Sequence, residues 1–269
     1  MSNDSLNTLL FNLDERNLAH VLSAVAFAAL ASRDSDARTF ESTCWWEQDG
    51  FALKTALASA TLLSDADGFL RSLRWVPGMG GKEQGTFMAG SEFGTNPFIS
   101  LAGSGQESSP FKTFAANQNP AEHLLGPQQG KLKVPSESDS WLFQIAFGVS
   151  SWGFDSRVGS HAYDLGFSSN DEGSGVLDPI YPAIELMSIA ASSFFAAVHS
   201  WQWDESTVGY SIWTQPISTS LACYAVAGRL VGLPARRYRV TTRGGAYGKG
   251  GAFRFFPEAM LQIQKGNLI

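Results

Sequence analysis

Residues 17–31 read Asn-Leu-Ala-His-Val-Leu-Ser-Ala-Val-Ala-Phe-Ala-Ala-Leu-Ala, a run in which almost every position is apolar or small. The run contains neither Pro nor Gly and therefore favours a helix, for which Asp14 or Asn17 can supply the cap. A surface helix is apolar on one side only, whereas a helix that is apolar on all sides is buried. We therefore expect the rest of the chain to pack around this helix.

The other segments alternate between helical and extended patterns without the regular order of a parallel α/β fold. Helices are predicted at residues 56–74, broken or kinked near Ser64–Gly68, and at residues 179–199 and 217–231. Strands are predicted at residues 7–13, 38–46, 50–54, 141–149, 209–214, 236–243 and 251–256, with a hairpin at Asp49-Gly50. This pattern predicts an α+β fold of antiparallel sheets with a few long buried helices and an irregular, loop-rich middle region.

Residues 76–140 differ from the rest because Gly, Ser, Gln, Asn and Pro dominate them. Short apolar islands interrupt this composition at Thr86–Ala89, Phe98–Ala102 and Phe111–Ala115. A stretch of this length is seldom plain loop in a compact domain, so the islands predict short strands joined by long loops. Gly103–Ser109 and Lys131–Ser140 are the segments that we expect to be disordered. The chain is thus predicted to be a single domain, residues 1–269, with a loop-rich insertion at 76–140.

Charge is sparse and unevenly distributed along the sequence. Only 16% of the residues are charged, against 44% hydrophobic, which indicates either a surface largely covered by partners or simply a polar, uncharged one. Residues 229–269 hold eight Lys or Arg and one acid, a net charge of +7, so the total of −6 leaves −13 for residues 1–228. The basic residues are Arg229, Arg236, Arg237, Arg239, Arg243, Lys249, Arg254 and Lys265. A basic C-terminal segment on an acidic body indicates an anion-binding face.

The two cysteines, Cys44 and Cys223, form no CxxC pair and predict neither a disulfide framework nor a zinc site. They are typical of buried thiols in a reducing cytoplasm. Residues 1–16 are polar and acidic, unlike a signal peptide, and no apolar run is long enough to cross a bilayer. We therefore expect a cytoplasmic protein with no membrane partner, no cofactor and no metal.

The densest basic segment, residues 236–254, predicts a basic C-terminal hairpin over residues 236–256. In a strand, alternate residues share a face, so one face of this segment is basic and the other apolar. The basic face comprises Arg237, Arg239, Thr241 and Arg243, and the apolar face comprises Tyr238 and Val240. The expected loop, Gly244–Gly250, contains Tyr247 and Lys249, and its glycines allow phosphate to approach the backbone. The alternative is an edge strand that charge protects from unwanted pairing.

Residues 151–167, Ser-Trp-Gly-Phe-Asp-Ser-Arg-Val-Gly-Ser-His-Ala-Tyr-Asp-Leu-Gly-Phe, combine charges, aromatic rings and glycines with almost no periodicity. They predict a structured loop in which Asp155 or Asp164 holds Arg157, or a turn through the core whose ion pair satisfies only itself. His161 lies close to both carboxylates in sequence and is the best-placed histidine for acid–base chemistry. The usual catalytic spacing motifs are absent, however, so no enzyme activity is expected.

Residues 110–118, Pro-Phe-Lys-Thr-Phe-Ala-Ala-Asn-Gln, form a second dense polar and aromatic segment. Lys112, Asn117 and Gln118 carry donors that suit phosphates or base edges. The alternative is a short helix or strand whose two phenylalanines anchor a loop-rich region. Composition alone leaves both interpretations open.

A series of short motifs follows one another along the chain in an informative order. The motifs are Cys44–Trp46, Phe111–Ala115, Gly153–Arg157, Tyr163–Ser168, Tyr181–Leu186, Ser211–Pro216 and Tyr238–Gly245. The series resembles a family of CRISPR-associated proteins encoded in type I-U (also called I-G) operons. The likeness extends over residues 8–257, and its most specific parts are Phe111–Ala115, Gly153–Arg157 and Tyr181–Leu186. The chain departs from the family at Arg16-Asn17-Leu18, where the family has Asn-Pro-Gly before the first helix.

The resemblance implies a non-catalytic, large-subunit-like component of the Cascade surveillance complex, a ribonucleoprotein of antiviral defence. Such a complex pairs a guide RNA with target DNA and recruits a helicase–nuclease. We then expect contacts with guide RNA and target DNA near the flanking motif at the guide 5′ end, beside the backbone and guide-processing subunits. The expected nucleic-acid contacts are Lys112, Asn117, Gln118, Arg157, Arg237, Arg239, Arg243 and Lys249. The alternatives are a structural subunit that contacts only protein, and a small-molecule enzyme that uses Asp155, His161 and Asp164.

Overall fold

Helices and antiparallel sheets are interleaved in the computed structural model, which describes residues 6–35, 41–78, 81–88, 98–100, 124, 128, 139–147, 155–157, 180–198, 207–241, 243–247, 251–255 and 259–261. The helices are α1 (Leu18–Ser35), α2 (Ser59–Ser72), α5 (Pro182–Val198) and α6 (Ala222–Val226), with the 3₁₀ helices η3 (Asp139–Phe143) and η4 (Thr219–Leu221). The strands are β1 (Asn7–Phe11), β2 (Thr43–Glu47), β3 (Gly50–Thr55), β4 (Arg74–Gly78), β5 (Gly81–Met88), β6 (Phe98–Ser100), β7 (Thr207–Trp213), β8 (Ile217–Ser218), β9 (Ala235–Thr241), β10 (Arg243–Tyr247), β11 (Gly251–Phe255) and β12 (Met260–Leu261). These helices and antiparallel sheets confirm the predicted α+β class.

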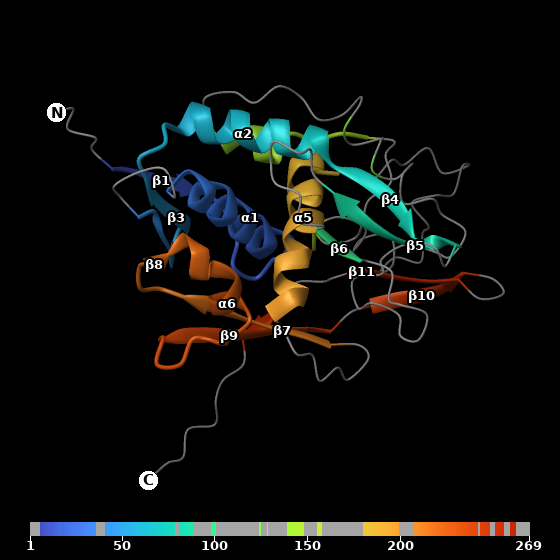
Figure 1. The fold of residues 1–269 in the computed structure, drawn as a ribbon. Helices are drawn as coiled ribbons and strands as arrows, with labels where there is room; N and C mark the ends of the chain where they lie inside the picture. Colours follow the sequence, from blue (N-terminus) through green and yellow to red (C-terminus); the bar gives the residue numbers. More distant parts are fainter. Residues whose placement is uncertain are drawn as a thin grey trace, which may run out of the picture.

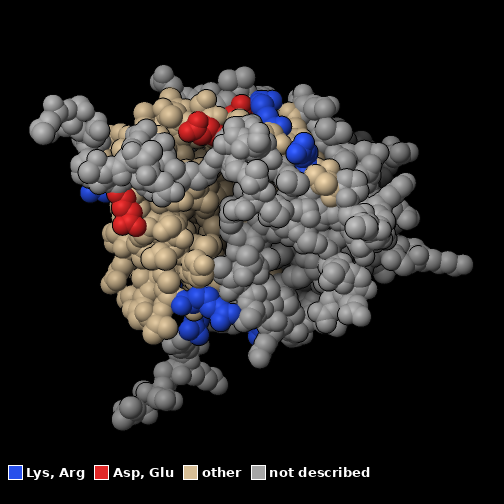
Figure 2. Space-filling view, viewed as in Figure 1, with Lys and Arg blue, Asp and Glu red and all other residues tan. Residues whose placement is uncertain are grey.

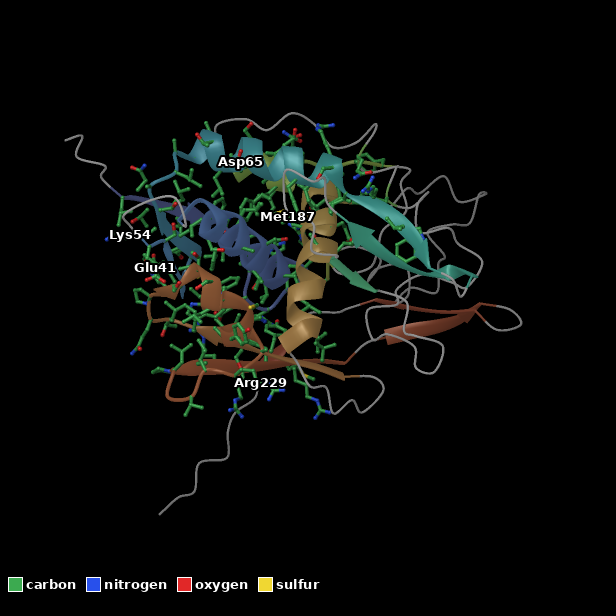
Figure 3. All side chains as sticks on the ribbon, viewed as in Figure 1. Glu41, Lys54, Asp65, Met187 and Arg229 are labelled. Atoms are coloured by element: carbon green, nitrogen blue, oxygen red, sulfur yellow. The ribbon has the colours of Figure 1, made fainter. Side chains whose placement is uncertain are left out.

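Helix α1 lies at the centre of the fold, as its apolar composition predicts, and crosses α5 (Figure 1). Small side chains allow the two helices to approach closely. The Ser23 hydroxyl donates to the carbonyl of Ala19 at 2.8 Å, and the Ser188 hydroxyl donates to Ile184 at 2.7 Å and across the crossing to Ala19 at 3.0 Å. Figure 3 shows Met187 on α5 beside α1 and below α2, where it is fully buried. The hydroxyls thus satisfy their polar groups inside an otherwise apolar contact.

A four-stranded sheet of order β1-β3-β2-β8 packs against α1 on one side. Its inward aromatic residues join it to the neighbouring strand β7. The ring of Phe51 lies 5.4 Å from Trp46 and 6.4 Å, edge to face, from Trp213. The indole Nε1 of Trp213 donates to the carbonyl of Cys44 at 3.0 Å, so this buried donor is satisfied by the sheet itself.

The turn predicted at Asp49-Gly50 is present between β2 and β3. Gly50 has a φ of 144°, and a Cβ atom there would lie 2.1 Å from the carbonyl oxygen of Phe11 on β1. Both the backbone conformation and the close approach of β1 therefore require glycine. The same contact aligns β1 with β3, where Phe11 pairs with Phe51.

The middle region contributes a three-stranded sheet of order β4-β5-β6. The predicted strands at Thr86–Ala89 and Phe98–Ala102 are confirmed by β5 and β6. The apolar island Phe111–Ala115 and the segment Gly103–Ser109 lie outside the described residues. All but the last two residues of Lys131–Ser140 also lie outside them.

Two predicted elements are wrong in their local geometry. The helix at 56–74 has no break near Ser64–Gly68, because α2 continues unbroken and buries a single stripe that includes Leu62, Ala66 and Phe69. The described residues 141–147 form no strand: the apolar residues 141–143 belong to η3, and one isolated bridge joins Ala146 to Ile180. Short apolar runs do not distinguish a strand from a buried helical turn by pattern alone.

The helix predicted at 217–231 is much shorter than expected. Pairing with β2 takes Ile217 and Ser218 into the first sheet as β8. At the other end, Gly228 adopts a φ of 69°, its N–H bonds to Ala225, and the N–H of Arg229 bonds to the carbonyl of Tyr224. This pair of bonds is a Schellman motif, which ends a helix at a left-handed glycine.

The basic hairpin predicted at 236–256 is divided between two sheets. Strand β9 pairs with β7 and β12, whereas β10 and β11 form a separate two-stranded hairpin. Residues 244–247 are consequently part of a strand, not of the glycine-rich loop that the composition indicated. In β10, Arg243 pairs with Phe255.

None of the helices in the described part of the chain combines the length and the apolar character that crossing a membrane requires.

Candidate nucleic-acid interface

Strand β9 is the middle strand of the β12-β9-β7 sheet, and its side chains alternate as the sequence predicts. Tyr238 and Val240 are buried, whereas Arg237 and Arg239 are exposed on the opposite face. Figure 2 shows Lys and Arg side chains gathered at the lower edge of the described surface, where Figure 1 places β9 and β7. We call this side, with Arg237 and Arg239, the outer face of the sheet.

The inner face of β9 is tied to the segment before α1 by one carboxylate. The Tyr238 hydroxyl donates to Oε1 of Glu15 at 2.7 Å, and the other oxygen of that carboxylate forms an ion pair with Arg236. Tyr238 also stacks on Tyr210 of β7 at 5.6 Å, and the Tyr210 hydroxyl donates to the carbonyl of Glu15 at 2.9 Å. Burial, together with the hydrogen bond to Glu15, raises the pKa of Tyr238 to about 12. These contacts hold β9 so that Arg237 and Arg239 face outward.

We expect Glu15→Ala to lower the free energy of unfolding by about 1 kcal/mol, because the phenol of Tyr238 and the guanidinium of Arg236 both lose their acceptor. Glu15→Gln keeps an acceptor oxygen for the phenol and should lose less. Urea unfolding of the two variants measures the difference. Equal losses for Ala and Gln would show that the charge on Glu15, rather than its hydrogen bond to Tyr238, carries the effect.

A second polar cluster lies where α1 begins. The side-chain oxygen of Asn17 accepts from the N–H of Ala19 at 3.0 Å, which confirms Asn17 as a cap of α1. Its amide nitrogen donates to Asp155 at 2.8 Å, and its oxygen also lies 3.4 Å from the N–H of Ser156. The N–H of Asp155 in turn donates to the carboxylate of Glu185 on α5 at 3.3 Å. The short turn at 155–157 therefore connects the first turns of α1 and α5.

Asp155 holds Arg157, which confirms one of the two pairings that the sequence left open. The Arg157 Nε lies 2.9 Å and 3.2 Å from the two carboxylate oxygens, and Nη2 lies 2.5 Å from Oδ2. The Asp155 side chain is fully buried, and 34% of the Arg157 side chain is exposed. The guanidinium also stacks 3.7 Å from the ring centre of Tyr181, with Phe143 at 5.5 Å. This geometry gives Arg157 a structural role, and its nucleic-acid contact stays a prediction.

The electrostatics of this cluster depend on the arginine. Burial of Asp155 would by itself raise its pKa, but the hydrogen bonds and the positive charge of Arg157 outweigh burial and lower the pKa below its ordinary value of 3.8. The carboxylate therefore stays ionised and paired. A carboxylate occupied in this way is poorly suited to accept a proton from a substrate.

His20 lies beside this cluster and is 3% exposed. Its Nδ1 accepts the backbone N–H of Asp14 at 2.8 Å, which places the proton on Nε2, an atom that has no hydrogen-bond partner among the described residues. Burial lowers the pKa of His20 to about 4, with Asp155 and Asp14 opposing the shift and Arg157 adding to it. The imidazole is consequently neutral at pH 7.

The remaining predicted contacts are not brought together by the described residues. Lys112, Asn117, Gln118 and Lys249 lie outside them, as do His161 and Asp164 of the alternative catalytic set. The backbone of Arg243 begins β10, and its side chain is not among the described ones. Within the described ranges, no three His, Cys, Asp or Glu side chains gather to hold a metal ion. Cys44 and Cys223 are free thiols, and burial raises the pKa of both.

Sequence reasoning missed the residues that hold the predicted ones in place. Glu15 contacts Arg236 and Tyr238 across separations of 221 and 223 residues, which no local pattern indicates. Tyr181 was noted only as part of a motif, although its ring supports Arg157. The one available signal was Asn17, a cap residue that directly follows the charged run Asp14-Glu15-Arg16.

No protein-family model, no curated protein and no solved structure matches this chain.

Proposed function

We propose that this chain is a non-catalytic, nucleic-acid-binding subunit of an RNA-guided type I surveillance complex, similar to the large-subunit-like protein of type I-U (I-G) Cascade. The observation that carries the proposal is the outer face of β9. There, Arg237 and Arg239 are exposed side by side while the inner face is held by Glu15. Guanidinium groups fixed on a sheet suit phosphate oxygens, because each presents several N–H donors in a rigid plane.

In the proposed complex, base pairing and protein contacts have different roles. Base pairing between guide RNA and target reads the sequence, and protein contacts with the backbone supply affinity. Two exposed arginines therefore suffice for a contribution to binding without a catalytic centre. The carboxylate of Asp155, which the alternative enzyme requires, is already occupied by Arg157 and Asn17.

The test is co-expression of the full chain with its operon neighbours, followed by purification through a tag on this chain. We expect guide RNA to co-purify, and the assembled particle with Arg239→Glu to bind target DNA more weakly, with a shallower dependence on salt. Lys54→Glu is the matched control, because Lys54 is exposed on β3, away from β9, and the change in net charge is the same (Figure 3). Unchanged affinity and salt slope for Arg239→Glu, or equal losses for both variants, would contradict the proposal.

A purely structural subunit is the second candidate, and the apolar surface near α6 favours it. Leu221 and Tyr224 are 40% and 44% exposed one helical turn apart, and Val231 is fully exposed. Such side chains suit burial against another protein. In this case Tyr224→Asp and Val231→Asp should break the complex apart, whereas Arg239→Glu should leave target binding normal.

A further inference from the structure

On the outer face of the β12-β9-β7 sheet, the side chains in one row differ greatly in size from strand to strand. Antiparallel pairing places Gly209 of β7, Arg239 of β9 and Met260 of β12 in one row. Directly paired residues share a face, and neighbouring strands are about 4.8 Å apart. Arg239 is therefore flanked on one side by a position without a side chain and on the other by Met260, which is 70% exposed.

Gly209 is a glycine that the fold itself does not require. Its φ is not in the left-handed region, and among the described atoms a Cβ atom there would meet only the carbonyl oxygen of Tyr238, at the ordinary contact distance of 3.8 Å. Glycine inside a strand weakens the strand, and its usual uses are a bulge or the close approach of another backbone. The pairing of β7 with β9 is regular from Thr207 to Trp213, so no bulge accounts for it. Of these two uses, the close approach of another backbone is the one that the regular pairing leaves open.

The cationic groups of this face lie along a single line. Arg237 and Arg239 are alternate residues of β9, so their Cα atoms are about 7 Å apart. That spacing is comparable to the distance between successive phosphates of one extended nucleic-acid strand. The outer positions on β7 that pair with them are Ser211 and Gly209, and neither carries a charge. A duplex presents two backbones and a groove between them, whereas one line of arginines along a single strand matches one backbone.

One end of this line is closed by the turn after α6. Ser211, which pairs with Arg237, is buried, and a Cβ atom on Gly228 would lie 3.1 Å from its hydroxyl. The Schellman motif at Gly228 fixes the exposed Arg229 next to this end, and Figure 3 shows Arg229 at the lower edge of the molecule near β9. The described face is thus a short track that runs along β9, with Arg229 at one end.

From this geometry we infer that the outer face binds one extended, single-stranded nucleic acid, with successive phosphates on Arg237 and Arg239. This inference rests on the proposed nucleic-acid function and specifies its ligand. The sugar–phosphate backbone lies over Gly209, which has no side chain of its own to obstruct it. The exposed thioether of Met260 contacts the face of an unstacked base, a contact that a paired and stacked base does not offer.

The experiment measures fluorescence anisotropy of the full-length chain with labelled single-stranded DNA and RNA of mixed sequence, and with a duplex of the same sequence. We expect single strands to bind at least tenfold more tightly than the duplex. Arg237→Gln and Arg239→Gln should each weaken single-strand binding about tenfold and make the salt slope shallower by about 0.7. Arg236→Gln is the matched control, because Arg236 lies next to them in sequence but is held by Glu15 on the inner face.

Gly209→Thr separates steric access from charge. The one described neighbour of a Cβ atom at this position lies at an ordinary contact distance, which predicts that the folded sheet tolerates threonine, a good strand former; thermal melting checks this. We expect single-strand binding to weaken about tenfold with an unchanged salt slope, because no phosphate contact is lost.

If duplex binds as tightly as single strands, or if Gly209→Thr binds normally, the inference is wrong while the proposed function stands. If an acidic polypeptide binds with the same dependence on Arg237 and Gly209, the surface recognises protein and the inference is also wrong. Failure of guide RNA to co-purify with the assembled complex would instead remove the proposed function.

Discussion

Arg157→Leu is expected to lower the free energy of unfolding by about 4 kcal/mol, the typical cost of removing one partner from a buried ion pair. The carboxylate of Asp155 is fully buried, and leucine leaves it with the amide of Asn17 but without a counter-charge. The stacking of the guanidinium on Tyr181 is lost as well. Because the turn at 155–157 connects the starts of α1 and α5, the loss should appear in the global unfolding transition. Urea unfolding followed by Trp fluorescence measures it.

The control for this prediction removes the carboxylate charge of Asp155, which Arg157→Leu leaves without a partner of opposite charge. In the double variant Asp155→Asn with Arg157→Leu, no buried carboxylate remains, and an amide in its place still offers an acceptor to Asn17. We expect the double variant to be more stable than Arg157→Leu alone, a non-additive result that identifies the uncompensated charge as the main cost. A loss of less than 1 kcal/mol for Arg157→Leu would mean that water reaches Asp155 readily and that the cluster contributes little to stability.

The second large effect is a loss of stability in mild acid that comes from His20. Its pKa is lowered from 6.5 to about 4 in the folded protein, so the unfolded chain binds the extra proton first as the pH falls. Stability from this group is complete above pH 6.5 and is lost as the pH decreases towards 4, by about 3 kcal/mol in total. Because the pKa of Asp155 is lowered, the contribution of Asp155 to stability is lost only at a pH below this range. Thermal melting between pH 7 and pH 4 measures the change.

His20→Asn is the matched variant for the acid effect. The asparagine side chain can place its oxygen where Nδ1 accepts the N–H of Asp14, but it does not titrate in this range. We expect the variant to be less stable than the native chain at pH 7, because it leaves a cavity beside Phe143, and to lose much less stability on acidification. Equal pH profiles for the two proteins would assign the acid sensitivity to other groups.

Patterns that depend only on neighbouring residues predicted this fold well. The apolar run that became α1 was visible because its whole circumference is apolar, and the faces of β9 followed from alternation. The secondary-structure predictions were wrong where contacts with distant segments decide the local conformation. Ile217 and Ser218 belong to a strand because β2 lies beside them, and the apolar residues 141–143 belong to a 3₁₀ helix.

The candidate site shows the same division. A basic segment with an exposed face was predictable, since strand alternation is a local property. The sequence does not show that Arg236 and Arg237, which are adjacent and chemically identical, have different roles. That difference depends on Glu15, which reaches Arg236 only after β9 has docked beside the start of α1. Similarly, the sequence does not show that Gly209 lies opposite Arg239, because the pairing of β7 with β9 brings them together.

By itself, the amino-acid sequence determined the buried central helix, the antiparallel α+β class and the existence of a basic strand near the C-terminus. The tertiary structure alone decided which carboxylate holds which arginine. The physical reason is range: hydrophobic periodicity acts within a helical turn or along one strand, whereas an ion pair forms only when folding brings two distant groups within a few ångströms.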